Sequence, residues 1–178
     1  MSFHGELLRR GFWLYVWDIR TGDKRHLYVG GTGDGSFGDA SSPLQRVAQH
    51  LDFRESAKAN SLAKQLKAVA IDPSLCSFEL TALGSLFPEP SEEYKAFHDR
   101  VAALEAMLAR HLRERGYNVI GAHSSRRAPD PEIWAQVCEI INKKFVDRGV
   151  SFNQDTEQIV DSFGRSLLSK RKSDKNKD

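Results

Sequence analysis

The pattern of hydrophobic and polar positions predicts a β-hairpin near the beginning of the chain. Residues 12–19 are rich in aromatic and β-branched side chains, and residues 26–30 have the same composition. Thr21-Gly22-Asp23, between the two segments, has the composition of a tight turn. Residues 75–83 alternate well enough to form a third strand, and residues 117–120 return to an extended conformation. The chain is therefore expected to contain three or four strands.

Apolar residues spaced by three and four positions predict five helices. Their approximate ranges are 43–55, 61–71, 91–116, 131–147 and 154–168. The first follows the start signal Ser42-Pro43 and has its apolar stripe at Leu44, Val47 and Leu51. The longest ends at Gly116 and carries the apolar positions Phe97, Val101, Leu104, Leu108 and Leu112. Each stripe is expected to face the core.

This order of elements predicts an α+β fold. We expect a small antiparallel or mixed sheet of three to four strands, flanked by helices, with additional helices at the C-terminal end. A chain of 178 residues has the length of one domain with an appendage. The expected organisation is a main domain over 1–125, a helical extension packed on it over 126–168, and a basic disordered tail over 169–178.

Composition excludes several classes of protein. Hydrophobic residues make up 40% of the chain, which is enough for a small core, and no apolar run approaches the roughly 18–20 residues that cross a bilayer. We therefore expect a cytoplasmic protein with no membrane partner. The two cysteines, Cys76 and Cys138, form no metal or redox motif and are predicted to be small core residues.

The charge of the chain is unevenly distributed. Its net charge is +2, from 26 Lys and Arg against 24 Asp and Glu. Residues 163–178 hold six basic and two acidic side chains, a local charge of +4, so the rest of the chain carries −2. A binding site for a polyanion on that nearly neutral body must be a local patch.

Two helices carry polar residues at positions of interest. Arg46 and His50 are four residues apart on the first predicted helix, so they share one face beside its apolar stripe. Together they could bind one anion, whereas the simpler interpretation is a solvated pair on the helix flank. Glu105 lies at the border of the buried stripe of the longest helix. A carboxylate there needs a partner, either a metal ion or, more commonly, a salt bridge.

Three further polar residues have simple local interpretations. Tyr15 and Tyr28 fall in the middle of the two hairpin strands, where propensity alone favours packing residues whose phenols need hydrogen-bond partners. Asn118 follows Gly116-Tyr117 and would, on local grounds, be a turn residue.

The order of these residues along the chain resembles the signature of the GIY-YIG nuclease superfamily. In that family two short tripeptides lie on a β-hairpin, an Arg on the next helix, a Glu on a later helix and an Asn just past it. The matching positions, within residues 12–122, are Leu14-Tyr15-Val16, Tyr28-Val29-Gly30, Arg46, Glu105 and Asn118. His50 matches a His found in some restriction-enzyme members. The first tripeptide keeps only its Tyr.

The resemblance implies hydrolysis of a DNA phosphodiester bond that depends on one divalent metal ion, Mg²⁺ or Mn²⁺. Glu105 would be the metal ligand and Arg46 would neutralise charge on the scissile phosphate. Tyr15, helped by the metal or by His50, would deprotonate the attacking water, and Tyr28 would orient water or phosphate. Asn118 would position the site through hydrogen bonds.

The partner implied is DNA. Besides Arg46, four basic residues beyond the resemblance are candidates for phosphate contacts, although a solvated face explains them as well: Arg126, Arg127, Lys143 and Lys144. The alternative to an active endonuclease is a catalytically inactive module on the same scaffold that binds nucleic acid or protein. A third interpretation is an unrelated α+β protein in which the order of these residues is coincidental.

Overall fold

The computed structural model describes residues 3–33, 40–89 and 93–146. The chain divides into two units, 1–146 and 147–178, and every element described here belongs to the first. The predicted helix over 154–168 and the basic tail over 169–178 lie outside the described residues, as does most of the loop over 32–42.

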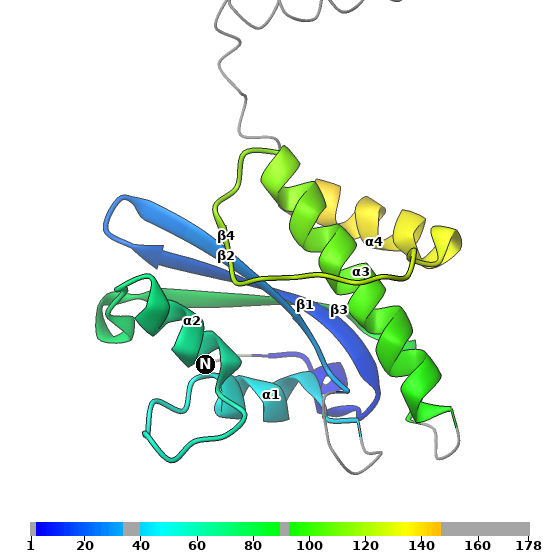
Figure 1. The fold of residues 1–178 in the computed structure, drawn as a ribbon, viewed down its shortest axis with the longest axis horizontal. Coiled ribbons are helices and arrows are strands. Elements are labelled where there is room, and N and C mark those ends of the chain that lie inside the picture. Colours follow the sequence, from blue (N-terminus) through cyan, green and yellow to red (C-terminus); the bar gives the residue numbers. More distant parts are fainter. Residues whose placement is uncertain (1–2, 34–39, 90–92, 147–178) are drawn as a thin grey trace, which may run out of the picture. The chain divides into compact units, whose positions relative to one another are not determined.

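A mixed sheet of four strands forms the centre of this unit, in the order β3-β1-β2-β4 (Figure 1). Strands β1 (Phe12–Thr21) and β2 (Lys24–Gly31) form the predicted antiparallel hairpin. Its turn contains Gly22 in the left-handed region, at φ +54°, which favours glycine. Strand β3 (Ser77–Phe87) pairs antiparallel with β1, whereas the two-residue β4 (Val119–Ile120) pairs parallel with β2.

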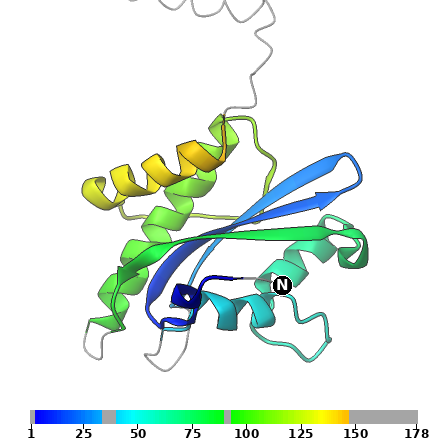
Figure 2. The same ribbon diagram turned by 180° about the vertical axis from the view of Figure 1, so that it is seen from behind.

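Helices cover both faces of the sheet (Figures 1 and 2). Helices α1 (Pro43–His50) and α2 (Ser61–Ala68) pack on the face that carries Tyr15, Trp17 and Tyr28. Helices α3 (Tyr94–Glu114) and α4 (Pro131–Lys144) pack on the opposite face. Two short 3-10 helices, η1 (Gly5–Leu8) and η2 (Pro73–Leu75), complete the elements. The predicted α+β class is confirmed.

Several predicted boundaries are wrong by a few residues, each for a local reason. Helix α1 ends at His50 and not near residue 55, because the Asp52 carboxylate accepts the backbone N–H of Arg54 at 3.1 Å in a turn. Helix α2 ends three residues early, since Ala70 adopts φ +55°. Strand β3 continues to Phe87 because its pairing with β1 continues to Phe12.

The core has one layer on each face of the sheet. The face under α3 and α4 is the more apolar, and α4 contributes Val137, Ile141 and Phe145 to it. The cysteines, predicted to be core residues, are both half-buried: Cys76, just before β3, packs against the edge of the core, and Cys138 lies on α4. No helix of the described residues is long and apolar enough to cross a membrane.

Asp18 forms ion pairs with two arginines on the face of the sheet that α3 and α4 cover. Asp18, 2% exposed, accepts hydrogen bonds from Arg25 at 2.7 and 2.8 Å and from Arg20 at 3.0 Å. Burial by itself would raise the pKa of the Asp18 carboxyl, but the hydrogen bonds from both arginines outweigh it and lower that pKa. The Arg25 guanidinium also lies over the rings of Tyr117 and Phe145, 5.1 and 5.7 Å from their centroids.

Candidate active site

Helix α1 buries its polar pair more completely than its apolar stripe. Ser42 caps the helix by accepting the N–H of Gln45 at 3.2 Å, and Pro43 occupies its first turn. This start rotates the helix so that Arg46 and His50 are 7% and 1% exposed. The predicted stripe of Leu44, Val47 and Leu51 is only half-buried. The interpretation of the polar pair as a solvated flank is therefore wrong.

His50 meets Tyr15 beneath α1. The Tyr15 hydroxyl lies 2.5 Å from His50 Nε2 and donates to the Gly31 carbonyl at 3.0 Å. His50 Nδ1 accepts the backbone N–H of Leu62 at 3.4 Å, at the beginning of α2. Because Nδ1 is an acceptor, the neutral ring carries its hydrogen on Nε2 and donates it to the Tyr15 oxygen. The hydrogen bonds to His50 and to the Gly31 carbonyl together fix the position of the Tyr15 hydroxyl.

Burial keeps His50 uncharged. Desolvation first, and the positive charge of Arg46 second, lower the pKa of His50 from 6.5 to about 3. Arg46 lies one helical turn before His50 on α1, and its guanidinium donates to Gln49 Oε1 at 2.9 Å. At neutral pH the site therefore holds one cation, Arg46, beside a neutral imidazole.

Gly30 is required by the position of Tyr15. Gly30 pairs with Tyr15 across the hairpin, and the Tyr15 ring crosses directly over it. A Cβ atom at residue 30 would lie 2.6 Å from Tyr15 Cε2 and 2.8 Å from the hydroxyl oxygen. The second matching tripeptide thus supplies the space that the Tyr15 phenol occupies.

Tyr28 lies between His50 and a second histidine, His123. Its ring centroid lies 5.7 Å from that of His50 and 6.0 Å from that of His123. His123 belongs to the segment that follows β4, and its Nε2 donates to the Val29 carbonyl of β2 at 2.9 Å. His123 therefore contacts β2 at the residue that follows Leu27 and Tyr28, the two residues of β2 that pair with β4.

Glu105 reaches the same end of β2 from α3. Its Oε1 lies 3.8 Å from His123 Nε2, and its side chain is 29% exposed. Desolvation is the main cause that lowers the pKa of His123, so at neutral pH this contact joins a carboxylate to an uncharged ring. A Cβ atom at residue 31 would lie 3.5 Å from Glu105 Oε2, so Gly31 leaves space beside the carboxylate.

Four of the six predicted catalytic residues thus lie together on the α1 side of β2, and the fifth, Glu105, is joined to them through His123: Tyr15, Tyr28, Arg46, His50 and Glu105. The sixth, Asn118, lies elsewhere along the strand, where its Nδ2 donates to His26 Nδ1 at 3.0 Å. Within the described parts of the chain, no hydrogen bond or ring contact connects Asn118 to the other five.

The other predicted DNA contacts differ in their surroundings. Lys143 pairs with Glu139 at 2.8 Å, and Lys144 pairs with Glu79. Arg127 pairs with Asp99 at 2.9 Å. In the described part of the chain, Arg126 makes no ion pair or hydrogen bond through its side chain.

The donor set limits how a metal ion could be held. Among the residues that the structure describes, no group of three or more His, Cys, Asp or Glu side chains is arranged to bind one. Glu105, partly exposed and next to Gly31, offers a single carboxylate. Magnesium fits such a site, since it retains several waters and binds through one or two carboxylates together with substrate phosphates.

Sequence reasoning missed His123, which contacts both Tyr28 and Glu105. The signal available was its place three residues after a predicted strand, at Gly121, Ala122 and His123. This position indicates a site residue only if β4 is known to pair with β2, and the sequence does not reveal that pairing. Gly121, at φ +91°, turns the chain so that His123 returns to β2.

Comparison with known proteins adds no relative. No protein-family model matches the chain, and no similar protein was found among curated proteins or solved structures.

Proposed function

We propose that the protein is a divalent-metal-dependent endonuclease that hydrolyses phosphodiester bonds of DNA, of the GIY-YIG type, acting in the cytoplasm. The observation that carries this proposal is the chain of contacts that joins Tyr15, His50 and Tyr28 and then, through His123, Glu105. Besides His123, these residues come from four separate elements. Packing alone gives no reason for two phenols, a buried imidazole and a carboxylate to be joined in this way.

Glu105 would hold the metal ion. Its carboxylate is the partly exposed group of the set, and Gly31 leaves space beside it. The bound ion would supply Lewis-acid polarisation of the scissile phosphate and activation of a water molecule. His123 orients the carboxylate from the other side, because its own position is fixed by the hydrogen bond to Val29.

Arg46 would provide the positive charge that the phosphate needs. Arg46 extends from α1 and is buried, and the nearby imidazole of His50 stays neutral, so water screens the charge of Arg46 little. A planar guanidinium suits two oxygens of a phosphate as its charge develops. Removal of one such group commonly costs about 10²–10³-fold in rate.

The two tyrosines would act on the attacking water. Tyr15 would act as the base, and the hydrogen bonds of its hydroxyl to His50 and to the Gly31 carbonyl would hold it in place for that role. Tyr28, between the rings of His50 and His123, would orient the water or the phosphate. Asn118 would act from a distance, by positioning β2 through His26.

The test is cleavage of supercoiled plasmid with Mg²⁺ or Mn²⁺, with EDTA as the control for metal dependence. We expect nicking by the unaltered chain and its loss in the Glu105→Gln and Arg46→Ala variants. Glu114→Gln is the matched control, because Glu114 lies on the same helix with its side chain 66% exposed. Melting temperatures of all variants separate loss of chemistry from loss of fold.

Two outcomes would overturn the proposal. Cleavage that survives Glu105→Gln in folded protein would remove the metal role of that carboxylate. Absence of cleavage on plasmid, branched and damaged DNA, by protein that still shifts DNA in a gel, would favour the inactive binding module.

A further inference from the structure

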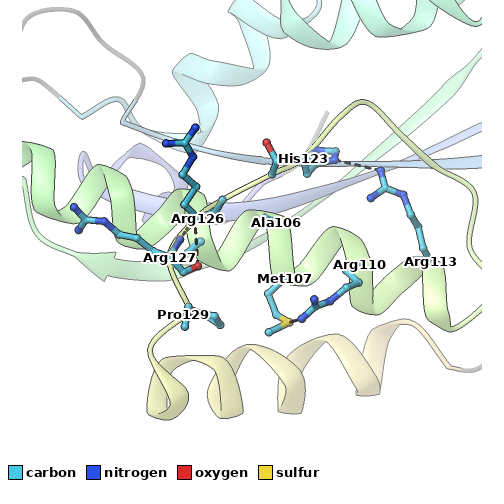
Figure 3. A pocket seen from close by; sticks show the side chains of 12 residues that line it. Ala106, Met107, Arg110, Arg113, His123, Arg126, Arg127 and Pro129 are labelled. Carbon is cyan, nitrogen blue, oxygen red and sulfur yellow. Dashed lines mark hydrogen bonds between the residues drawn. The ribbon is translucent and has the colours of Figure 1, made fainter.

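A pocket of about 520 Å³ lies between α3 and the segment that follows β4 (Figure 3). We call it the arginine pocket, because four arginines line it: Arg110, Arg113, Arg126 and Arg127. Helix α3 lines the pocket with residues spaced by three and four positions, so one face of the helix forms its wall. Small side chains at Ala103 and Ala106 leave the space open.

The charge of the arginine pocket is positive. None of its lining residues, all within the described ranges, is acidic. Arg127 is neutralised by Asp99. Arg110 donates to the uncharged sulfur of Met107 at 2.7 Å (Figure 3), and its contact to Glu114 is long, at 3.9 Å, with both side chains more than 60% exposed. An exposed pair at that distance contributes little and leaves Arg110 available.

Arg113 is held in place by neutral groups. Its Nη2 donates to the carbonyls of Val119 at 3.2 Å and Gly121 at 2.8 Å, and lies 3.4 Å from His123 Nδ1 (Figure 3). These partners position the guanidinium without cancelling its charge. Arg126, which makes no ion pair in the described part of the chain, extends from the segment at the other side of His123 (Figure 3).

The arginine pocket adjoins the candidate active site. His123 belongs to both, since its Nδ1 faces Arg113 while its Nε2 lies 3.8 Å from Glu105 Oε1. Ser124 and Ser125, next along the chain, add hydroxyl groups to the pocket wall. Guanidinium and hydroxyl donors without a carboxylate are the groups that bind phosphate oxygens.

We propose that the arginine pocket binds successive phosphate groups of the DNA strand that passes Glu105, through Arg110, Arg113 and Arg126, whose guanidinium groups lie at different points along the pocket (Figure 3). The identity of that strand as a substrate rests on the proposed function, whereas the phosphate chemistry of the pocket does not. A free nucleotide offers the same phosphate chemistry, so the two sources are separated by experiment.

The experiment measures binding without cleavage. A fluorescent DNA duplex is titrated with the full chain in EDTA, at several salt concentrations, by fluorescence anisotropy. We expect Arg110→Ala/Arg126→Ala to weaken binding about tenfold at 0.1 M salt, and to make the slope of log affinity against log salt shallower by about 2. The control Lys58→Ala/Lys95→Ala removes the same charge from exposed positions outside the pocket and is expected to change binding little.

A second variant covers the risk that the double variant loses its fold. Ser125→Asp adds a negative charge at the pocket wall and retains an acceptor for the backbone N–H of Arg127, which Ser125 Oγ accepts at 3.1 Å. We expect Ser125→Asp to weaken DNA binding several-fold with an unchanged melting temperature.

Titrations with inorganic phosphate and with dAMP, by calorimetry, identify the source of the phosphate. Weaker DNA binding in both pocket variants supports the strand. Unchanged DNA binding with loss of phosphate and dAMP binding supports a free nucleotide and overturns the strand. No change with any ligand overturns the pocket as a phosphate site. Cleavage is scored separately: pocket-dependent binding by a chain that never cleaves would overturn the nuclease and leave the pocket.

Discussion

The two faces of the sheet each bury charged or polar groups, and they do so in different ways. On the face under α3 and α4, Asp18 is bonded to Arg20 and Arg25, all within one hairpin. On the face under α1 and α2, Tyr15 and Tyr28 meet His50 from α1. The first group is compensated by neighbours in sequence, whereas the second is assembled from distant segments.

This difference separates a structural network from a candidate site. The charge of Asp18 is matched by two guanidinium groups, and Arg25 is covered by aromatic rings, so the network presents no reactive group. Around β2 the imidazole of His50 stays neutral, and the carboxylate of Glu105 remains partly exposed. We therefore expect changes to the first group to affect stability and changes to the second to affect activity.

The largest expected effect is on stability, from Asp18→Ala. Loss of this carboxylate leaves Arg25, whose side chain is 18% exposed, without its partner, which costs about 3–5 kcal/mol of the free energy of unfolding. Urea unfolding measures the change. Arg20→Ala, at a side chain that is 57% exposed, is the control and should cost less than about 1 kcal/mol.

If Asp18→Ala loses cleavage below its melting temperature while it keeps its stability, the Asp18 network is not purely structural and the contrast between the two faces is wrong. The double variant Asp18→Leu/Arg25→Met tests the structural role further. Removal of both charges is expected to restore most of the stability, because a buried ion pair is often replaceable by apolar residues.

The next effect is on activity, from Glu105→Gln. We expect cleavage to fall by about 10²–10³-fold, because the amide lacks the charge that would hold the metal ion. The free energy of unfolding should change by less than about 1 kcal/mol, since the carboxylate is partly exposed. Single-turnover cleavage and urea unfolding of the same preparations measure both quantities. Equal losses of stability in Glu105→Gln and Asp18→Ala would remove the distinction between the two faces.

A smaller effect is expected from Gly30→Ala. The added methyl group would overlap the Tyr15 ring, and overpacking of this kind costs about 1–3 kcal/mol. Because Tyr15 must move, its contact with His50 should weaken and the cleavage rate should fall, by less than in Glu105→Gln. Gly84→Ala on β3 is the matched control: a Cβ atom there has nothing within 4 Å. It is expected to be neutral or to stabilise by about 0.4–1 kcal/mol. Equal behaviour of the two variants would contradict the packing argument.

The sequence predicted the hairpin, its turn and the end of α3 at Gly116 because those features depend on neighbouring residues. Gly116, at φ +81°, adopts the left-handed conformation that ends such a helix. The direction in which α1 faces could not be predicted in the same way. Its apolar positions, Val47 and Leu51, indicated one buried face, but burial of Arg46 and His50 depends on Tyr15 across the interface.

The site shows the same division between local and long-range information. Tyr15, Tyr28 and Glu105 were found by their order along the chain. His123 could not be, because its role arises only when β4 pairs beside β2. Asn118 was expected at the site from that order, and the structure places it beside His26. A residue's place on a strand is local information, whereas its neighbour on the next strand depends on register.

The smallest expected effect is a pH dependence of stability that originates at His50. The pKa of His50 in the folded protein is about 3, below its ordinary value of 6.5. Between these values the unfolded chain binds a proton that the folded chain does not, so stability is complete above about pH 6.5 and falls as the pH drops. From pH 7 to pH 5.5 the loss attributable to His50 is about 1 kcal/mol. Urea unfolding at both pH values gives the change in the free energy of unfolding for the unaltered chain and for His50→Gln. The difference between these two changes is the contribution of His50.

The lowered pKa values of His26 and His123 affect both proteins equally, so their contributions cancel in that difference. Asp18 contributes nothing in this interval, because its lowered pKa removes stability only below the ordinary value of 3.8. If His50→Gln loses the same stability, His50 is solvated and its contact with Tyr15 is wrong. If only the unaltered chain loses stability, the loss originates at a neutral, buried His50, which is the arrangement proposed for the face under α1.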